Sequence, residues 1–297
     1  MPDRSWPPRP TLGSAFYKAH GLGNDYLVFK TGSDWVPTVQ AVSVVCHRTR
    51  GIGSDGIVVL DADSGPDPFL ARMFNPDGSE FERSGNGLRI LASYLSREGM
   101  VDEAPFHVDV AGQTVEMIVH STTRGIHDVS VDMGRARTGP HAIGLAPDAL
   151  DSNGQLPGPD GRPLDVVPVW VGNPHVVVLG TTMSDEVFEA IGPWLATHKA
   201  IAHGTNVQLA RGMGEGRMFA RIWERGVGPT SASGTSACAV ATASVERELQ
   251  PPGLVHVETA GGVLQVGVAP DLAITLRGPV AEVAEGRLLM PGPDPVP

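Results

Sequence analysis

The chain has 297 residues, enough for one large domain or two of ordinary size, and its 41% hydrophobic and 19% charged residues are typical of a globular protein. The net charge of −11 argues against a nucleic-acid or anionic-membrane partner, because both carry negative charge themselves. The chain has only two cysteines, no apolar leader and no run long enough for a membrane helix, so we expect a soluble, reduced, cytoplasmic protein.

Short segments of alternating polarity predict mostly β-structure between two Pro-rich ends. Residues 1–14 and 291–297 lack hydrophobic periodicity, and we expect disordered tails there. The predicted strands are 26–30, 56–60, 71–75, 106–110, 114–119, 129–133, 166–171, 175–179, 206–210, 218–223, 255–259, 263–268 and 273–276. The turn-rich segment 138–165 is expected to be a surface excursion.

Helical periodicity is clearest at 87–99 and 236–249, and it is weaker at 39–48 and 185–197. Each of the two clear helices follows a strand and then a glycine-rich turn that carries Ser-Gly. The stretches "RMFNPDGSEFERSGNGLRILA" and "ARIWERGVGPTSASGTSACAVA" therefore repeat one arrangement. This repetition predicts two similar α/β halves that face each other across a cleft.

The serine at the start of each clear helix has two interpretations. Ser84 and Ser233 stand where N-cap residues stand, and serine is among the best caps. The backbone N–H groups at a helix start also attract anions, and glycines let a ligand come close to them. Two helix starts at one cleft would hold one carboxylate and place a residue on either face of the adjacent carbon. That arrangement suits removal of a proton from one face and its return to the other.

Seven motifs in one order resemble the cofactor-independent diaminopimelate epimerase family, which is related to proline racemase. They span about residues 16–290 and read "KAHGLGNDYLVF", "RGIGSDGIVVL", "FNPDGSEFERSGNGLR", "VGNPH", "GTNVQ", "WERGVGPTSASGTSACA" and "LRGPVAEVAEG". The resemblance implies an α/β (α+β) fold of two pseudo-symmetric halves, each a central helix wrapped by strands. The halves would comprise 15–127 plus 279–290, and 128–278.

The resemblance also implies an activity. It implies an isomerase that epimerises the α-carbon of an amino acid, with LL-2,6-diaminopimelate foremost, as a step in lysine biosynthesis. It implies no pyridoxal phosphate or other cofactor and no metal. It further implies a homodimer. The expected binding partner is a small-molecule amino-acid substrate.

In the resembled family two cysteines flank the α-carbon, one as base and one as acid, and Ser84 and Ser233 stand in their places here. His175 would lie beside this catalytic pair as the candidate to take a proton from a serine, although a structural role in the "NPH" turn is an open alternative. The resemblance assigns substrate binding to Asn24, Asn75, Gly85, Asn86, Asn173, Asn206, Glu224, Arg225, Gly234 and Thr235. Backbone N–H groups of those at the helix starts would face the reacting carboxylate, and the others would hold the distal carboxylate and amine. Without the resemblance, Glu224 and Arg225 could equally be a surface ion pair, and Asn75 and Asn206 turn residues.

The two serines leave three explanations open. An engineered Cys-to-Ser pair would trap a bound substrate, but Pro229 and Ser236 also depart from the family pattern. A natural member could have changed chemistry, towards a dehydratase or isomerase acting on a hydroxy- or unsaturated acid. A third possibility is a protein that kept only binding. Cys46 and Cys238 lie elsewhere in the pattern and do not replace the lost thiols.

Other site classes have weaker support. The ten histidines show no spacing typical of a metal site. "GLGND" lacks the continuation of a dinucleotide fingerprint, and "SASGTSAC" lacks the G-x-S-x-G turn of many serine hydrolases.

Overall fold

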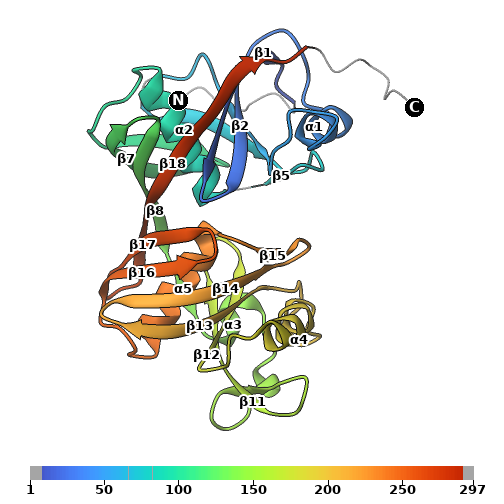
Figure 1. Cartoon of the computed structure of the whole chain (residues 1–297), viewed down its shortest axis with the longest axis vertical. Coiled ribbons are helices and arrows are strands. Elements are labelled where there is room, and N and C mark those ends of the chain that lie inside the picture. The colour runs from blue at the N-terminus through green and yellow to red at the C-terminus, as the bar shows by residue number, and fades with distance from the viewer. Residues whose placement is uncertain (1–8, 66, 82, 290–297) are drawn as a thin grey trace. The chain divides into compact units, whose positions relative to one another are not determined.

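A computed structural model describes residues 9–289 of the chain, apart from positions 66 and 82. Its mixed α/β fold divides into two compact units (Figure 1). The first unit runs to Val131 and resumes at Pro279, and the second is Asp132–Gly278. Of the helices within the described residues, none is both long and apolar enough to cross a membrane.

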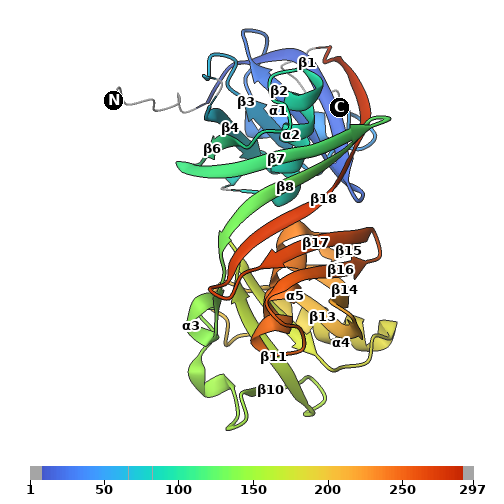
Figure 2. The same cartoon turned by 90° about the vertical axis from the view of Figure 1, so that its left-hand side faces the viewer.

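The first unit wraps its strands around helix α2. Its elements are β1 (Leu12–Gly21), β2 (Asn24–Thr31), α1 (Val39–Cys46), β3 (Ile57–Leu60), β4 (Phe69–Phe74), β5 (Glu80–Phe81), α2 (Gly85–Arg97), β6 (Phe106–Val110), β7 (Gln113–Thr123), the start of β8 (Ile126–Arg135) and the end of β18 (Ala273–Arg287). Helix α2 packs against β1, β2, β3 and β7 (Figure 2). Leu88, Ile90 and Leu95 are completely buried, and burial of each such side chain contributes roughly 1.5–3 kcal/mol.

The second unit wraps its strands around helix α5. Its remaining elements are β9 (Arg137–Thr138), α3 (Pro140–Ile143), a 3₁₀ turn η1 (Pro147–Ala149), β10 (Gln155–Pro157), β11 (Pro163–Trp170), β12 (Pro174–Leu179), α4 (Asp185–Ala196), β13 (Asn206–Gly214), β14 (Arg217–Glu224), β15 (Gly228–Thr230), α5 (Gly234–Glu246), β16 (Gly253–Thr259) and β17 (Gly262–Val268). Helix α5 packs against β11 to β14, β16 and β17. The helix is buried on all sides, mainly through small residues such as Ala237, Ala239 and Ala241, which let strands approach it closely.

The two units repeat one strand topology. In the first, β1–β2 is antiparallel, β2–β3 parallel, β3–β4 and β4–β5 antiparallel, β4–β6 parallel and β6–β7 antiparallel. In the second, β11 to β17 pair in the same sequence of directions. Helices α1 and α4 occupy the same place in the order, as do α2 and α5. The predicted α/β fold with a strand-wrapped helix in each half is confirmed.

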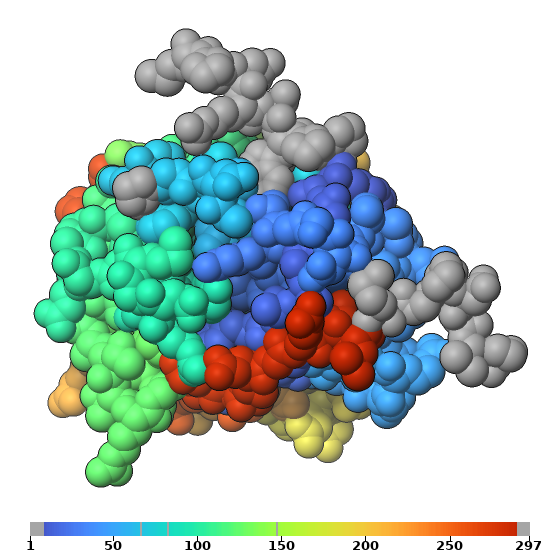
Figure 3. Space-filling model, turned by 90° about the horizontal axis from the view of Figure 1, so that it is seen from above, coloured from blue at the N-terminus to red at the C-terminus, as the bar shows by residue number. Residues whose placement is uncertain are grey.

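The N-terminal tail predicted for residues 1–14 is wrong at its end, because β1 already begins at Leu12. The Leu12 side chain is completely buried in a cluster with Phe29 and Trp35, and its N–H donates to the Trp35 carbonyl at 2.7 Å. Further along, β1 pairs with the C-terminal strand β18, which lies in red beside the blue N-terminal strands in Figure 3. Residues 1–8 and the second predicted tail, 291–297, lie outside the described residues.

The predicted surface excursion at 138–165 is also wrong in part. Ile143, Leu145, Leu156 and Leu164 are buried in one cluster with residues of α4. These isolated apolar side chains are spaced too widely for a periodic pattern, so only the folded chain brings them together. By contrast, the four predicted helices are confirmed as α1, α2, α4 and α5.

Candidate active site

The start of α2 carries Ser84, which caps the helix through its side chain. Its backbone is extended, and its Oγ accepts a hydrogen bond from the Gly87 N–H at 3.1 Å. Gly85 and Asn86 are the first two helical residues, so their N–H groups have no acceptor within the helix. This first turn can therefore donate two hydrogen bonds to an anion, with the positive end of the helix dipole behind them.

Ser233 has the equivalent place at the start of α5, but its side chain does not cap the helix. Its backbone is also extended, and its side chain makes no capping hydrogen bond. The residue is 9% exposed, so a hydroxyl that the helix does not use lies almost buried at the helix start. Gly234 and Thr235 follow as the first two helical residues, and their N–H groups also have no intrahelical acceptor.

The turn between β1 and β2 lies on the first turn of α2. The Asn86 carboxamide nitrogen donates to Asn24 Oδ1 at 2.8 Å and to the Gly21 carbonyl at 3.4 Å. A Cβ added at Gly21 would lie 2.8 Å from Asn86 Oδ1, so a side chain there would push the turn off the helix. Two residues that the sequence assigned to substrate binding, Asn24 and Asn86, are thus brought into direct contact.

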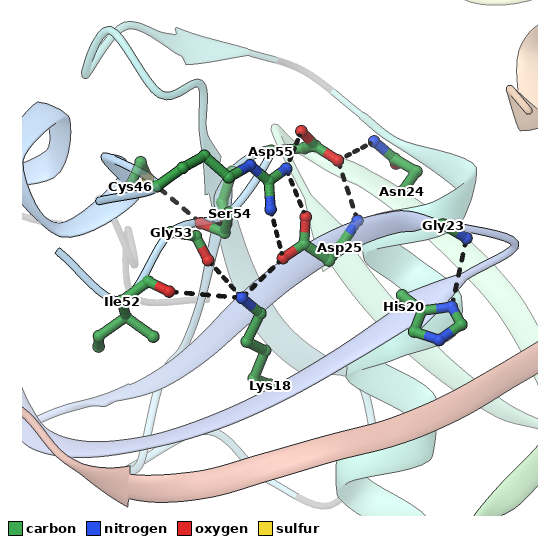
Figure 4. A network of polar contacts seen from close by, with 12 residues as sticks. Lys18, His20, Gly23, Asn24, Asp25, Cys46, Ile52, Gly53, Ser54 and Asp55 are labelled. Atoms are coloured by element: carbon green, nitrogen blue, oxygen red, sulfur yellow. Dashed lines mark hydrogen bonds and ion pairs between the residues drawn. The ribbon is translucent and has the colours of Figure 1, made fainter. Parts of the chain in front are cut away.

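A network of four charged residues, Lys18, Asp25, Arg48 and Asp55, is bonded to this turn (Figure 4). Asp25 accepts from Lys18 at 2.9 Å and from Arg48 at 2.7 Å, and Arg48 also reaches Asp55 at 2.6 Å. Burial alone would raise the pKa of Asp25, but hydrogen bonds from Arg48 and Lys18 hold it below its usual value. Burial raises the pKa of Asp55, and the negative charge of Asp25 adds to that rise. Asp55 Oδ2 accepts from the Asn24 carboxamide at 2.9 Å, which connects the charges to the turn.

His175 is completely buried in the second unit and has a partner at each ring nitrogen. Its Nε2 lies 2.6 Å from Asn173 Oδ1, and its Nδ1 lies 3.1 Å from the carboxamide nitrogen of Gln208. The same nitrogen of Gln208 donates to Ser236 Oγ at 3.0 Å. Burial lowers the pKa of His175 to about 3, so the ring is neutral at pH 7. A neutral ring with Nε2–H donating to Asn173 and Nδ1 accepting from Gln208 fits these contacts.

Asn206 joins this region to Arg225. Asn206 Oδ1 accepts from the Arg225 backbone N–H at 2.9 Å, and its Nδ2 donates to the Pro174 carbonyl at 3.2 Å. The Arg225 guanidinium donates to the His203 carbonyl, and the side chain is otherwise exposed. Glu224, which precedes it at the end of β14, is half-buried. The second unit therefore gathers Asn173, His175, Asn206 and Arg225 into one connected polar region.

Asn75 occupies a tight turn after β4. Its N–H donates to the Ser79 carbonyl at 2.8 Å, its side chain donates to Ser79 Oγ at 3.0 Å, and its carbonyl accepts from Gly78. The turn role is therefore observed, and substrate binding by Asn75 stays a prediction. Among the described residues, no group of three or more His, Cys, Asp and Glu side chains is placed to hold a metal ion.

Comparison with known proteins decides the family. The family model described as diaminopimelate epimerase matches residues 16–139 and 167–282. The chain is 38% identical over 276 residues to the diaminopimelate epimerase of Desulforudis audaxviator, covering 92% of this chain and 98% of that protein. It is 35% identical over 274 residues to diaminopimelate epimerase 2 of Nostoc sp., covering 92% and 95%. The chain belongs to the diaminopimelate epimerase family.

Solved structures of the same fold extend beyond this family. A hydroxyproline epimerase from Agrobacterium vitis, with bound trans-4-hydroxy-L-proline, matches with a TM-score of 0.68 at 15% identity and covers 94% of this chain and 93% of its own. A phenazine biosynthesis protein of the PhzF family from Bacillus anthracis matches with a TM-score of 0.65 at 15% identity, covering 93% and 99%. At these identities the likeness establishes the fold alone.

Several polar residues of the site were not singled out from the sequence. Gln208, Arg89 and Asp55 stand inside the family motifs "GTNVQ", "SGNGLR" and "GIGSDG", yet nothing local marks them as partners of His175, Asn86 and Asn24. Arg89 is completely buried on α2, where an arginine is unusual. An arginine between the apolar Leu88 and Ile90 is the one signal in the sequence that could have marked it.

The difference between the two serines predicts unequal effects on stability. We expect Ser84→Ala to lower the free energy of unfolding by about 1 kcal/mol, because it removes a capping hydrogen bond. Ser233→Ala should change it by no more than a few tenths of a kcal/mol, because no cap is lost. Urea unfolding of the two variants side by side measures this. Equal losses would contradict the assignment of the cap to Ser84 alone.

Proposed function

We propose that this chain is an epimerase that removes and returns the α-proton of an amino acid without pyridoxal phosphate, with LL-2,6-diaminopimelate as the leading substrate. The observation that carries the proposal is the repeated helix start. Each unit places a serine in extended backbone before a glycine and two N–H groups that the helix leaves unbonded. Membership of the diaminopimelate epimerase family supports the substrate class.

The two helix starts would act together on the reacting carboxylate. The N–H groups of Gly85 and Asn86 from one unit, and of Gly234 and Thr235 from the other, would donate to it. When the α-proton leaves, negative charge spreads onto that carboxylate, and fixed N–H donors and helix dipoles stabilise it. Ser84 and Ser233 would stand on opposite faces of the α-carbon as the two proton-transfer groups.

His175 fits a positioning role under this proposal. Both of its ring nitrogens are engaged, by Asn173 and by Gln208, and its lowered pKa keeps it neutral. The ring holds Asn173 Oδ1, which turns the Asn173 N–H groups towards other acceptors. His175 would therefore orient a binding amide, and its neutral ring with both nitrogens engaged is poorly suited to take a proton from a serine.

The distal end of the substrate would lie at the polar region of the second unit. Arg225 can grip a carboxylate in bidentate fashion, and Glu224 can accept from an ammonium group. The Asn206 carboxamide has one N–H that is not used by Pro174. A ligand with both a carboxylate and an amine at its far end, as in diaminopimelate, complements these groups.

A second candidate follows from the serines themselves. A hydroxyl is a much weaker acid than a thiol, so a Ser/Ser pair is poorly suited to deprotonating an α-carbon. A diverged member that acts as a dehydratase or isomerase on a hydroxy- or unsaturated acid would still remove a proton from carbon, but it would not need to return one to the opposite face. A catalytically silent ligand-binding protein, natural or from a Cys-to-Ser replacement, would need nothing from them.

The family also suggests a setting for the enzyme. We extend the proposal to a homodimer that acts in the cytoplasm in lysine biosynthesis. Sedimentation equilibrium of the purified protein tests the dimer, and a mass equal to one chain over the whole concentration range would contradict it.

Proton exchange in D₂O tests the proposed reaction. Purified protein is mixed with LL-diaminopimelate in D₂O, and the α-proton signal is followed by NMR. We expect the signal to be lost over time, with meso-diaminopimelate appearing. The matched control is the double variant Ser84→Ala and Ser233→Ala, in which exchange should stop. A stable α-proton with the unaltered protein, together with measurable binding, would instead favour the ligand-binding candidate.

A further inference from the structure

One continuous chain of side-chain hydrogen bonds runs through the first unit from α2 to the segment before β3. Arg89 donates to Asn86 Oδ1. Asn86 Nδ2 donates to Asn24 Oδ1 at 2.8 Å, and Asn24 Nδ2 donates to Asp55 Oδ2 at 2.9 Å, the last of these visible in Figure 4. Two carboxamides thus stand in series between a guanidinium and a carboxylate.

The residues at the two ends, Arg89 and Asp55, fix the direction of these hydrogen bonds. A carboxamide can turn by 180° and exchange its donor and acceptor ends with little change in shape, so its partners decide its orientation. A guanidinium can only donate, and a carboxylate can only accept. Arg89 therefore requires an oxygen from Asn86, and Asp55 requires an N–H from Asn24. Turning either amide would set two oxygens or two NH₂ groups against each other.

Both ends are themselves held in place. Arg89 is completely buried, and its other nitrogens donate to the carbonyls of Gly85 and Pro279, each at 3.3 Å. Asp55 accepts from Arg48 at 2.6 Å through Oδ1 and from the Asp25 N–H at 3.1 Å through Oδ2. Neither end can turn to follow an amide that has flipped.

The direction of these hydrogen bonds decides which donors and acceptors remain available to a ligand. The Asn86 carboxamide is used up, because Nδ2 donates to Asn24 and to Gly21 while Oδ1 accepts from Arg89. The Asn24 nitrogen has a second N–H, for which the described part of the chain provides no acceptor. Asn24 is half-buried, so part of the residue is open to solvent.

We propose that Arg89 and Asp55 are positioning residues that fix the Asn24 carboxamide so that it presents an N–H, and not a carbonyl, to a carboxylate oxygen of the substrate. Asn86 then acts on the ligand through its backbone N–H alone. This inference rests on the proposed function, in which Asn24 contacts an amino-acid substrate. Arg89 and Asp55 would then affect substrate binding through Asn24, although neither is expected to contact the substrate.

Ligand selectivity tests the inference without relying on turnover. The probes are LL-diaminopimelate and its monoamide, in which one carboxylate is a carboxamide, and binding is measured by calorimetry. Asp55→Asn is the main variant, because the Asp55 side chain is 37% exposed and the change keeps its shape. An asparagine at 55 can donate as well as accept, so the Asn24 amide is free to turn. We expect the preference for the diacid over the monoamide to fall about tenfold, whereas a merely structural role would weaken both ligands equally.

Arg89, at the other end of this series of hydrogen bonds, provides a matched pair of variants. Arg89→Gln should lower the preference for the diacid in the same way, and Arg89→Lys, which still only donates, should largely preserve it. In ¹⁵N-asparagine-labelled protein without ligand, the side-chain NH₂ signals of Asn24 and Asn86 should each be single in the unaltered protein. They should broaden or double in Asp55→Asn and Arg89→Gln.

The outcomes separate this inference from the proposed function. If the unaltered protein binds LL-diaminopimelate and Asp55→Asn keeps its preference for the diacid, the inference is overturned and the proposed function stands. Unchanged amide signals in both Asp55→Asn and Arg89→Gln would overturn it as well. If the unaltered protein does not bind diaminopimelate although the amide signals respond as expected, the proposed function fails and the fixed amide orientation stands.

Discussion

Changing Ser84 and Ser233 together to cysteine is expected to raise the rate of α-proton exchange from LL-diaminopimelate by at least about 10²-fold. One proton-transfer group typically contributes about 10²–10⁴ in rate, and a serine hydroxyl at these places is a far weaker acid than a thiol. A free thiol titrates near ~8.5, and a helix start lowers its pKa further, because the thiolate faces the positive end of the dipole. The measurement is loss of the α-proton NMR signal in D₂O.

The single variants make the comparison sharper. Ser84→Cys and Ser233→Cys alone should each gain less than the pair, because groups that act as one unit do not contribute independently. The two serine-to-alanine changes should abolish whatever exchange the unaltered protein has. A double-cysteine protein that binds diaminopimelate but exchanges no faster than the unaltered protein would show that these positions do not flank the α-carbon.

The buried His175 should make the protein sensitive to acid well above the range in which carboxylates titrate. Its pKa in the folded protein is about 3, against an ordinary value of 6.5, because burial disfavours the charged ring. Below pH 6.5 the unfolded chain takes up a proton that the folded protein does not, so stability falls as the pH drops from 6.5 towards 3. Between pH 7 and pH 4.5 this single group should cost about 2.5 kcal/mol of the free energy of unfolding.

A variant without the titrating ring isolates this effect. Urea unfolding of the unaltered protein and of His175→Gln is measured at pH 7 and at pH 4.5. His175→Gln should be the less stable protein at pH 7, since it disturbs the contacts with Asn173 and Gln208, but it should lose much less stability on acidification. If both proteins lose the same amount between the two pH values, the acid sensitivity does not come from His175.

Local patterns in the sequence predict the parts of the fold that depend on neighbouring residues. The Ser-Gly stretches before α2 and α5 mark helix starts because capping and glycine turns act over three or four residues. The alternation of polarity in β6 and β16 marks strands for the same reason. Leu12 escaped prediction because its burial depends on Trp35, and Leu145 and Leu156 because theirs depends on α4.

In the candidate site, too, the features set by neighbouring residues could be predicted and those set by distant residues could not. The residues at the helix starts could be named from the sequence, since their backbone geometry follows from the helix itself. The roles of side chains could not, because each depends on a partner far along the chain. Asn86 turns inward because Asn24 and Arg89 meet it, and the ring of His175 is set by Gln208, 33 residues away. Ser84 and Ser233 share a motif yet differ in capping, which no local pattern indicates.

The proposed reaction requires the starts of α2 and α5 to bind one substrate molecule. The most direct measurement is a titration of ¹⁵N-labelled protein with LL-diaminopimelate, followed through the backbone amide signals of Gly85 and Asn86, and of Gly234 and Thr235. We predict that both pairs shift together and saturate with one Kd, because in the proposed reaction the same carboxylate would accept from both helix starts. Shifts confined to one helix start, or two different Kd values, would contradict the claim.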